Sequence, residues 1–325
     1  MMTIRPFNYS DDDYQALADV SNAVWPDRPT VPEATKEQDK RRNPKYYLQR
    51  LVVESEGSII ASALYGESEW THVPGKFFVS VHVHPDHQRR GVGTALYDHI
   101  MEDLAERGPT IFEAHAREDR QEGMDFLEKR GFKRTLRDQM SELVVADFDP
   151  APFAWTVDRM AESGVEIRTV SELEADGVDW KREAWELEHE LMQDVPTDDP
   201  VTQQPLEQWA KWLTHPAFVP EAFFIAIVDG RFIGVTSLWQ SMAEKDKLHT
   251  NLTGTVRSQR RKGIATALKV LAIEFAQESG ARIIRTENEE NNPMYDLNVR
   301  LGFKPVPAWW TYRKELTDTN GDKPA

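Results

Sequence analysis

The pattern of apolar and polar residues along the chain predicts the same succession of elements twice. Alternating apolar residues predict strands, and apolar residues at a spacing of three to four predict helices. For the first half the pattern predicts strands at residues 3–7, 51–54, 58–65 and 77–84, a helix at 92–106, a strand at 111–115, a helix ending before Gly131, and a last strand. Ser10 and Asp11 stand where a helix after the first strand can begin.

The second half repeats this order. The pattern predicts strands at 165–170, 223–228, 232–238 and 249–256, a helix at 264–278, a strand at 282–286, a helix ending before Gly302, and a last strand. Ser171 and Glu174 form a capping-box pattern, and Asp229-Gly230 is a hairpin turn signal. Each half therefore predicts a mixed α/β domain, with helices packed on a twisted sheet.

Three markers recur in the same order and define a tandem repeat. The paired markers are Ile4-Arg5 with Ile167-Arg168, Gly91 with Gly263, and Gly131-Phe132 with Gly302-Phe303. The last two pairs are 172 and 171 residues apart, so the halves are two copies of one domain type. The expected organisation is a first domain at 1–147, a linker at 148–163 with a helix over 154–162, a second domain at 164–317, and a flexible tail at 318–325.

A basic, glycine-containing loop ends the longest strand of each half. Its two copies are Gln88-Arg89-Arg90-Gly91-Val92-Gly93-Thr94 and Arg260-Arg261-Lys262-Gly263-Ile264-Ala265-Thr266. A glycine loop that leads into a helix turns several backbone N–H groups toward one point, where the helix dipole also favours an anion. In a chain of formal charge -16, this repeated basic loop predicts a pyrophosphate site.

Composition excludes several classes of protein. The chain has 325 residues, which suits two domains, and its zero cysteines exclude a disulfide scaffold, a thiolate metal site and a cysteine nucleophile. The 55 Asp and Glu exceed the 39 Lys and Arg, which argues against a nucleic-acid or anionic membrane partner. No apolar run is long enough to span a bilayer and the start lacks a signal-peptide pattern, so we expect a cytoplasmic protein.

The chain resembles the GCN5-related N-acetyltransferase superfamily in a tandem arrangement. The resemblance rests on the loop motif, its place between a strand and a helix, the Gly-Phe pair that follows, and the repetition of all three. The resemblance implies acetyl transfer from acetyl-CoA to an amine, with the loop amides on the CoA pyrophosphate and the preceding strand along the pantetheine. The implied cofactor-binding residues are Val83, Gln88, Arg89, Arg90, Gly91, Val92, Gly93 and Thr94 in the first half, and Thr255, Val256, Arg260, Arg261, Lys262, Gly263, Ile264, Ala265, Thr266 and Asn291 in the second.

The two halves match this family unequally. The family usually has an Asn at the start of the last helix, which Asn291 supplies in the second half, where the first half has Arg120. The family's usual Tyr acid is replaced by Asn298 in the second half and by Leu127 in the first. The second half is therefore expected to be catalytic, and the first to bind acetyl-CoA without turnover or to be structural.

Several titratable residues allow two interpretations. His249, 14 residues before Gly263, is a candidate general base or a strand-end histidine without a catalytic part. His82 and His84 share one strand face, but a third metal ligand is not evident, so we expect no metal site. Three carboxylates at helical spacing, Glu186, Glu190 and Asp194, either face a cationic acceptor or form a solvated helix face.

The resulting hypothesis is an acetyl-CoA-dependent N-acetyltransferase that acts on a primary amine, with a small-molecule acceptor, by direct attack. Asn298 and His249 are its candidate catalytic groups, and a strand N–H near Thr255 or Val256 would polarise the carbonyl. Two alternatives remain open: a non-catalytic acyl-CoA-binding or regulatory protein, and an acetyltransferase for a protein N-terminus or lysine.

Overall fold

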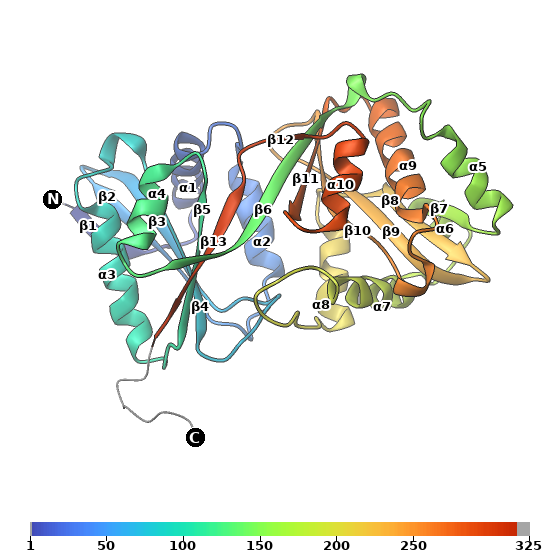
Figure 1. Cartoon of the computed structure of the whole chain (residues 1–325). Coiled ribbons are helices and arrows are strands. Elements are labelled where there is room, and N and C mark those ends of the chain that lie inside the picture. Colours follow the sequence, from blue (N-terminus) through green and yellow to red (C-terminus); the bar gives the residue numbers. More distant parts are fainter. Residues whose placement is uncertain (1, 317–325) are drawn as a thin grey trace. The chain divides into compact units, whose positions relative to one another are not determined.

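The computed structural model describes residues 2–316, so the tail predicted at 318–325 lies outside the described residues. The chain forms two compact units (Figure 1). The first unit contains the residues up to Leu136, the segment Asp198–Thr202 and the residues from Trp309 on. The second unit contains Arg137–Thr197 and Gln203–Ala308.

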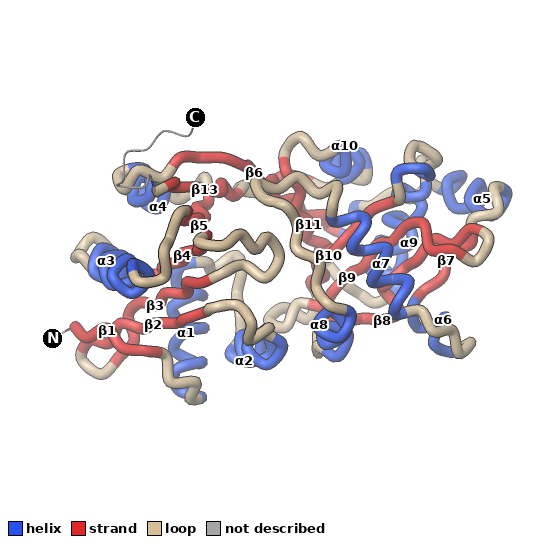
Figure 2. Tube along the Cα trace, turned by 90° about the horizontal axis from the view of Figure 1, so that it is seen from below, coloured by secondary structure: helices blue, strands red, loops and turns tan. Residues whose placement is uncertain are grey.

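The first unit is a sheet with helices on both faces. Its elements are β1 (Met2–Pro6), α1 (Asp11–Val24), α2 (Pro32–Arg41), β2 (Leu48–Ser55), β3 (Ser58–Gly66), β4 (Lys76–Val83), the short 3₁₀ helix η1 (Pro85–His87), α3 (Val92–Ala105), β5 (Ile111–Arg117), α4 (Gln121–Glu128) and β13 (Trp309–Glu315). The strand order is β1-β2-β3-β4-β5-β13. Figure 2 shows α1 and α2 on one face of these strands and α3 and α4 on the other.

The second unit repeats this arrangement. Its elements are β6 (Lys133–Val144), which begins in the first unit, η2 (Val145–Asp147), α5 (Ala154–Glu162), β7 (Glu166–Thr169), α6 (Val170–Ala175), α7 (Lys181–Met192), α8 (Leu206–Ala210), η3 (Lys211–Thr214), β8 (Phe218–Val228), β9 (Arg231–Gln240), β10 (Lys247–Thr255), η4 (Arg257–Gln259), α9 (Ile264–Glu278), β11 (Ile283–Glu289), α10 (Pro293–Arg300) and β12 (Lys304–Pro305). The strand order is β6-β11-β10-β9-β8-β7, and β12 pairs with β6.

The last strand of each sequence half completes the sheet of the other unit. Strand β6, which follows α4 in the chain, pairs antiparallel with β11 from Asp138↔Glu289 to Val144↔Ile283. Strand β13, which follows the elements of the second half, pairs antiparallel with β5 from Trp309↔Arg117 to Glu315↔Ile111. The compact units therefore differ from the predicted ranges 1–147 and 164–317 at these strands, because residue alternation predicts a strand but not its pairing partner.

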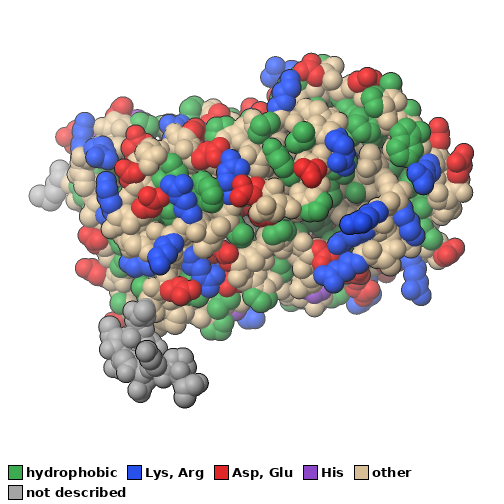
Figure 3. All heavy atoms as spheres, in the orientation of Figure 1, with side chains coloured by type: hydrophobic (Ala, Val, Ile, Leu, Met, Phe, Trp, Pro, Cys, Tyr) green, Lys and Arg blue, Asp and Glu red, His purple; other side chains and the backbone are tan. Residues whose placement is uncertain are grey.

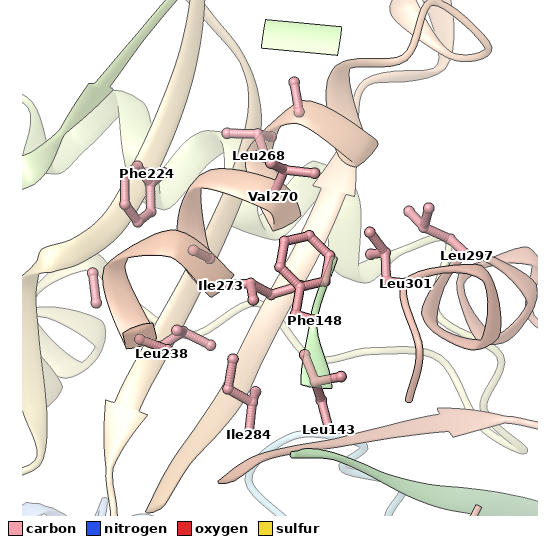
Figure 4. Close-up of a cluster of buried hydrophobic side chains, with 14 of the residues drawn as sticks. Leu143, Phe148, Phe224, Leu238, Leu268, Val270, Ile273, Ile284, Leu297 and Leu301 are labelled. Atoms are coloured by element: carbon pink, nitrogen blue, oxygen red, sulfur yellow. The ribbon is translucent and has the colours of Figure 1, made fainter. Parts of the chain in front are cut away.

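Separate apolar layers hold each sheet to its helices. In the first unit, Leu96, Ile100 and Leu104 of α3 are fully buried against the sheet. In the second unit, the buried side chains of α9 and α10 pack with those of β6 and β11 in one cluster, in which Figure 4 shows Leu268 of α9, Ile284 of β11 and Leu143 of β6. A further cluster lies under α6 and α7. Helix α9 forms because its apolar residues recur at helical spacing.

The helix starts follow local signals, with one correction. The Ser10 side chain accepts a hydrogen bond from the Asp13 N–H and caps α1, as expected. The capping box predicted at Ser171 and Glu174 is wrong. The box forms instead between Thr169 and Glu172, because β7 ends at Thr169 and its side chain is the first available to cap α6.

Candidate functional site

A pair of neighbouring parallel strands diverges in each unit. Strands β4 and β5 pair only from Lys76↔Ile111 to Phe78↔Glu113, although β4 continues to Val83. Strands β10 and β11 pair only from Lys247↔Ile283 to His249↔Arg285, although β10 continues to Thr255. Among the described residues, the strands beyond these pairs have no ladder partner on their facing edges. Each unit thus presents unpaired backbone groups along a widening gap.

The basic loops follow this gap and have matching backbone conformations. Arg89 and Gly91 have φ angles of 60° and 84°, and Arg261 and Gly263 have φ angles of 62° and 87°. Left-handed backbone at an arginine costs about 1 kcal/mol, so the conformation is specified by its surroundings. Left-handed residues next to right-handed ones turn successive N–H groups toward one side and form an anion-binding concavity.

The helices that follow the loops begin without side-chain caps. The N-cap residues of α3 and α9 are Gly91 and Gly263, neither of which has a side chain to accept a hydrogen bond. The first backbone bonds of the helices run from Ala95 N–H to Gly91 O, at 2.9 Å, and from Ala267 N–H to Gly263 O, at 3.0 Å. The amides of residues 92–94 and 264–266 precede these bonds and are placed to bind an anion.

The strand ends next to the two loops are equivalent. Gln88 Nε2 donates to Val83 O at 2.9 Å, and Arg260 Nε donates to Thr255 O at 3.1 Å. Val256 N–H donates to Ile233 O at 2.9 Å in the ladder. Since backbone groups alternate in direction along a strand, the Thr255 N–H is directed toward the gap and the Val256 N–H is not. Of the two donors considered from sequence, only that of Thr255 can serve a ligand there.

Thr255 also has an unused polar side chain. It is 7% exposed, and its Oγ1 atom has no hydrogen-bond partner. A buried hydroxyl without a partner is unfavourable and uncommon, which suits a position that a polar ligand completes. This orphaned atom and the uncapped N-terminus of α9 both fit the polar pantetheine and pyrophosphate of acetyl-CoA.

Asp194 organises the basic residues of the second loop. Its carboxylate bonds both Arg257 and Arg260, and the hydrogen bond from Arg257 holds the pKa of Asp194 below its usual range. Lys262 Nζ donates to Gln259 Oε1 at 2.6 Å. Arg261 is exposed. The loop therefore offers cations at its rim while its backbone amides lie at its centre.

The start of α10 differs by one residue from the expectation. Asn292 is the N-cap of α10, and its Oδ1 accepts from the Met294 N–H at 2.9 Å. Asn291, predicted at this position, is exposed and donates through Nδ2 to Glu289 Oε1 at 2.8 Å. Its role toward a cofactor stays a prediction.

Asn298, at the expected acid position, is completely buried. Its Nδ2 donates to Asn288 Oδ1 at 2.6 Å, and its Oδ1 has no partner. An amide can donate a hydrogen bond but has no proton to release near neutral pH. Asn298 can therefore orient a group beside β11, whereas general acid catalysis needs another donor.

In the first unit an aromatic side chain contacts both diverging strands. Trp25 Nε1 donates to His82 Nε2 of β4 at 3.3 Å, and the Arg117 guanidinium of β5 lies 4.8 Å from the Trp25 ring centroid. Trp309 packs on Trp25 with the ring centroids 4.9 Å apart. Burial lowers the pKa of His82 to about 4, so this histidine is neutral at neutral pH. Nothing in the described range 2–316 gathers three metal-ligating side chains.

The gap of the second unit begins at an irregularity of β10. The pairing of β10 with β9 shifts register between Thr250 and Thr253, directly after His249, whereas β3 and β4 pair without a shift. A bulge bends its strand and redirects side chains. His249 is partly buried and pairs with Trp239 on one side and with Arg285 on the other. The candidate base thus lies where the gap opens.

The structure favours the solvated-face interpretation for Glu186 and Glu190 of α7. Glu186 and Glu190 are exposed, whereas Glu188 between them is partly buried. Glu188 Oε2 accepts a hydrogen bond from Trp209 Nε1 at 2.6 Å, and burial raises the pKa of Glu188 to about 7. The signal was present in the sequence, because Glu188 interrupts the apolar spacing of Ala184, Leu187 and Leu191.

The comparisons with known proteins agree with this geometry. The acetyltransferase (GNAT) family matches residues 13–132 and 182–303, so the chain belongs to this family of enzymes and carries two such regions in tandem. The mycothiol acetyltransferase of Parafrankia sp. (strain EAN1pec) is 25% identical over 257 residues, covering 71% of this chain and 74% of that protein.

Two solved structures show the same fold over almost the whole chain. A tandem GNAT protein from the clavulanic acid biosynthesis pathway superposes with a TM-score of 0.75, at 19% identity, covering 98% of this chain and 100% of that one. A GCN5-related N-acetyltransferase from Sphaerobacter thermophilus gives 0.69, at 18% identity, covering 97% and 95%. The mixed α/β fold and the tandem family resemblance predicted from sequence are confirmed.

The surface agrees with the composition. On the face shown in Figure 3, acidic and basic side chains are interspersed and do not form a surface of one sign. Within residues 2–316, no helix combines the length and apolar character needed to cross a membrane.

Proposed function

We propose that this chain transfers the acetyl group of acetyl-CoA to a primary amine of a small molecule, and that the second unit performs the transfer. The observation that carries the proposal is the diverging pair β10 and β11, which leads into a left-handed loop and an uncapped helix. The curated relative supports a small-molecule acceptor, because its name, mycothiol acetyltransferase, describes transfer to a small molecule.

The backbone of the second loop would hold the pyrophosphate. The amides from Lys262 to Ala265 would cradle it, with Arg260 and Arg261 adding positive charge at the rim. Bound acetyl-CoA supplies an acetyl thioester that is already activated toward an amine. The Thr255 N–H, directed at the gap, would polarise the thioester carbonyl. With zero cysteines in the chain, direct attack by the amine replaces a cysteine-bound acyl intermediate.

Two polar side chains would assist at the gap of the second unit. Asn298 would act as a positioning residue that holds the Asn288 side chain through its hydrogen bond, since its buried amide cannot act as an acid. His249, at the opening of the gap, is one candidate for the group that removes the amine proton.

A different role is favoured for the first unit. Trp25 links side chains of both diverging strands there, through His82 and Arg117, and would hinder their separation around a pantetheine arm. The loop of that unit keeps the left-handed conformation at Gly91. This combination favours a unit that binds acyl-CoA weakly or not at all and does not transfer its acetyl group.

Isothermal titration with acetyl-CoA tests the assignment through a matched pair of variants. Gly91 and Gly263 have φ angles of 84° and 87°, so an aspartate is similarly strained at either position. No atom lies within 4 Å of a side chain built at Gly91, and the nearest atom at Gly263 is Met160 Cε at 3.7 Å. We expect one site per chain, lost in Gly263→Asp and retained in Gly91→Asp. Loss in Gly91→Asp alone contradicts the choice of unit, and no binding by the wild type contradicts the function.

A further inference from the structure

The inner face of α7 carries a carboxylate where its spacing predicts an apolar side chain. Ala184, Leu187 and Leu191 are buried and form the stripe that packs on the sheet. Glu188 follows Ala184 by four residues and precedes Leu191 by three, so it belongs to the same stripe. Its side chain therefore enters the layer between α7 and the sheet.

Few interactions within the protein stabilise the negative charge of the Glu188 carboxylate. Its one hydrogen bond within the described residues comes from the neutral indole of Trp209, and none of them forms an ion pair with it. Placing a carboxylate in such a layer without a cation is unfavourable, and burial accordingly raises the pKa of Glu188 to about 7. Leucine or glutamine would fit the stripe without this cost, so the carboxylate calls for a functional reason.

Helix α7 covers the strand that diverges. A side chain built at Gly254 of β10 would approach Leu191 to 3.0 Å, which shows how closely α7 packs there. Val235 of β9 belongs to the same apolar cluster as Leu191. Side chains alternate along a strand, so Ser237 and Trp239 share the face of Val235, toward α7 and α8.

Polar groups on this face lack partners. The Oγ of Ser237, in a residue with 0% exposure, and the Nε1 of Trp239 are buried without a hydrogen bond. His249 pairs directly with Trp239 and therefore lies on the same face. A carboxylate on α7, an orphaned hydroxyl and an orphaned indole N–H on β9 and a histidine on β10 thus lie on one side of the sheet, and the histidine is at the opening of the gap between β10 and β11.

We propose that Glu188 binds the ammonium group of the acceptor in this layer of the second unit and takes up its proton before acetyl transfer. This inference rests on the proposed function. A cationic amine supplies the positive charge that Glu188 lacks, and the indole ring of Trp209, which contacts Glu188, favours a cation beside it. Trp209 then positions the carboxylate by its hydrogen bond.

The proton and bond changes balance. An N–H bond of the ammonium breaks, and the proton passes to the Glu188 carboxylate, which becomes a carboxylic acid. The amine lone pair forms an N–C bond at the thioester carbonyl, the C–S bond breaks, and a second N–H proton passes to the thiolate. Glu188 finally releases its proton to water. The ammonium and acetyl-CoA thus give the acetamide, CoA and one proton.

The first test measures kcat/KM against pH for acetyl transfer to a panel of small primary amines. In Glu188→Gln we expect kcat/KM to fall by about 10²–10⁴-fold, the usual contribution of a general base. The ionisation near pH 7 should vanish from the profile, while acetyl-CoA affinity stays unchanged. Glu207→Gln is the matched control, because Glu207 is an exposed glutamate of the adjacent α8. Glu207→Gln should keep the wild-type kcat/KM and its pH dependence.

The second test does not depend on turnover. The indole N–H signal of Trp209, identified in a two-dimensional NMR spectrum by its loss in Trp209→Phe, should shift with a midpoint near pH 7 in the wild type. It should be independent of pH in Glu188→Gln. A signal that does not titrate in the wild type overturns the proposal.

The outcomes separate the two proposals. Wild-type transfer with an unchanged rate and profile in Glu188→Gln overturns the role of Glu188 and leaves the proposed function standing. If the ionisation near pH 7 is lost in His249→Gln but not in Glu188→Gln, His249 is the group that takes up the amine proton. That result also overturns the role of Glu188 and leaves the proposed function standing. Absence of transfer by the wild type overturns both proposals.

Discussion

A lysine buried in α9 leads to a prediction about stability and pH. Lys269 is 3% exposed, and its ammonium lies 5.1 Å from the ring centroid of Phe303. Burial lowers the pKa of Lys269 to about 7. The counterpart of Lys269 in the first unit, 172 residues earlier, is Tyr97, which packs on Phe132, the counterpart of Phe303. An uncharged side chain thus fills this position in the other copy of the fold.

The cost of this lysine follows from its pKa. The difference between the ordinary 10.5 and about 7, at about 1.4 kcal/mol per pH unit, is about 5 kcal/mol. Between these values the unfolded chain is protonated at Lys269 and the folded chain is not. The free energy of unfolding therefore rises with pH across this window, and the full cost applies below about pH 7.

Replacing Lys269 by methionine should remove this dependence. We expect Lys269→Met to raise the free energy of unfolding by up to about 5 kcal/mol at pH 6.5, with the gain shrinking toward pH 10. Urea denaturation followed by circular dichroism from pH 6.5 to 10 measures this, with Lys181→Met as a control at an exposed lysine. Parallel stability curves for the wild type and Lys269→Met would refute the reasoning.

Two further predictions concern ion pairs within single units. Lys76 is 3% exposed and its Nζ lies 2.5 Å from Glu113 and 2.6 Å from Asp199, so Lys76→Met should destabilise the first unit by about 3–5 kcal/mol. An unchanged melting temperature would contradict this. Asp194→Asn removes the carboxylate charge that pairs with Arg257 beside the second loop. The substitution should tighten acetyl-CoA binding about three- to fivefold at low salt. Weaker binding in the titration would show that Asp194 mainly orients the guanidinium groups.

Elements defined by local interactions were predictable from sequence. Helix α9 spans Ile264–Glu278 and α5 spans Ala154–Glu162, as their apolar spacing indicates. The left-handed residues at Gly91 and Gly263 were also foreseeable, because glycine adopts positive φ without steric cost. These features depend on a few adjacent residues, whose preferences act before any distant contact forms.

The candidate site was predictable only in part. The loops and the strand end at Thr255 followed from the motif, but the direction of the Val256 N–H depends on its ladder partner Ile233, which no local pattern reveals. Glu188 was overlooked because its neighbours Glu186 and Glu190 made the helix face look charged and solvated. The apolar spacing of Ala184, Leu187 and Leu191 marks its position in the sequence, and the packing of α7 shows that this one carboxylate faces inward.

The sequence by itself determined two copies of a mixed α/β fold, each with an anion-binding loop between strand and helix, because periodicity and glycine placement act locally. The tertiary structure decided which sheet each last strand joins. The alternation of side chains along β6 and β13 is compatible with pairing at any open sheet edge. The pairing partner is seen only in the tertiary structure, where backbone hydrogen bonds join β6 to β11 and β13 to β5. It also decided where β10 and β11 part and which side chains meet there, since both depend on pairing between residues far apart in the chain.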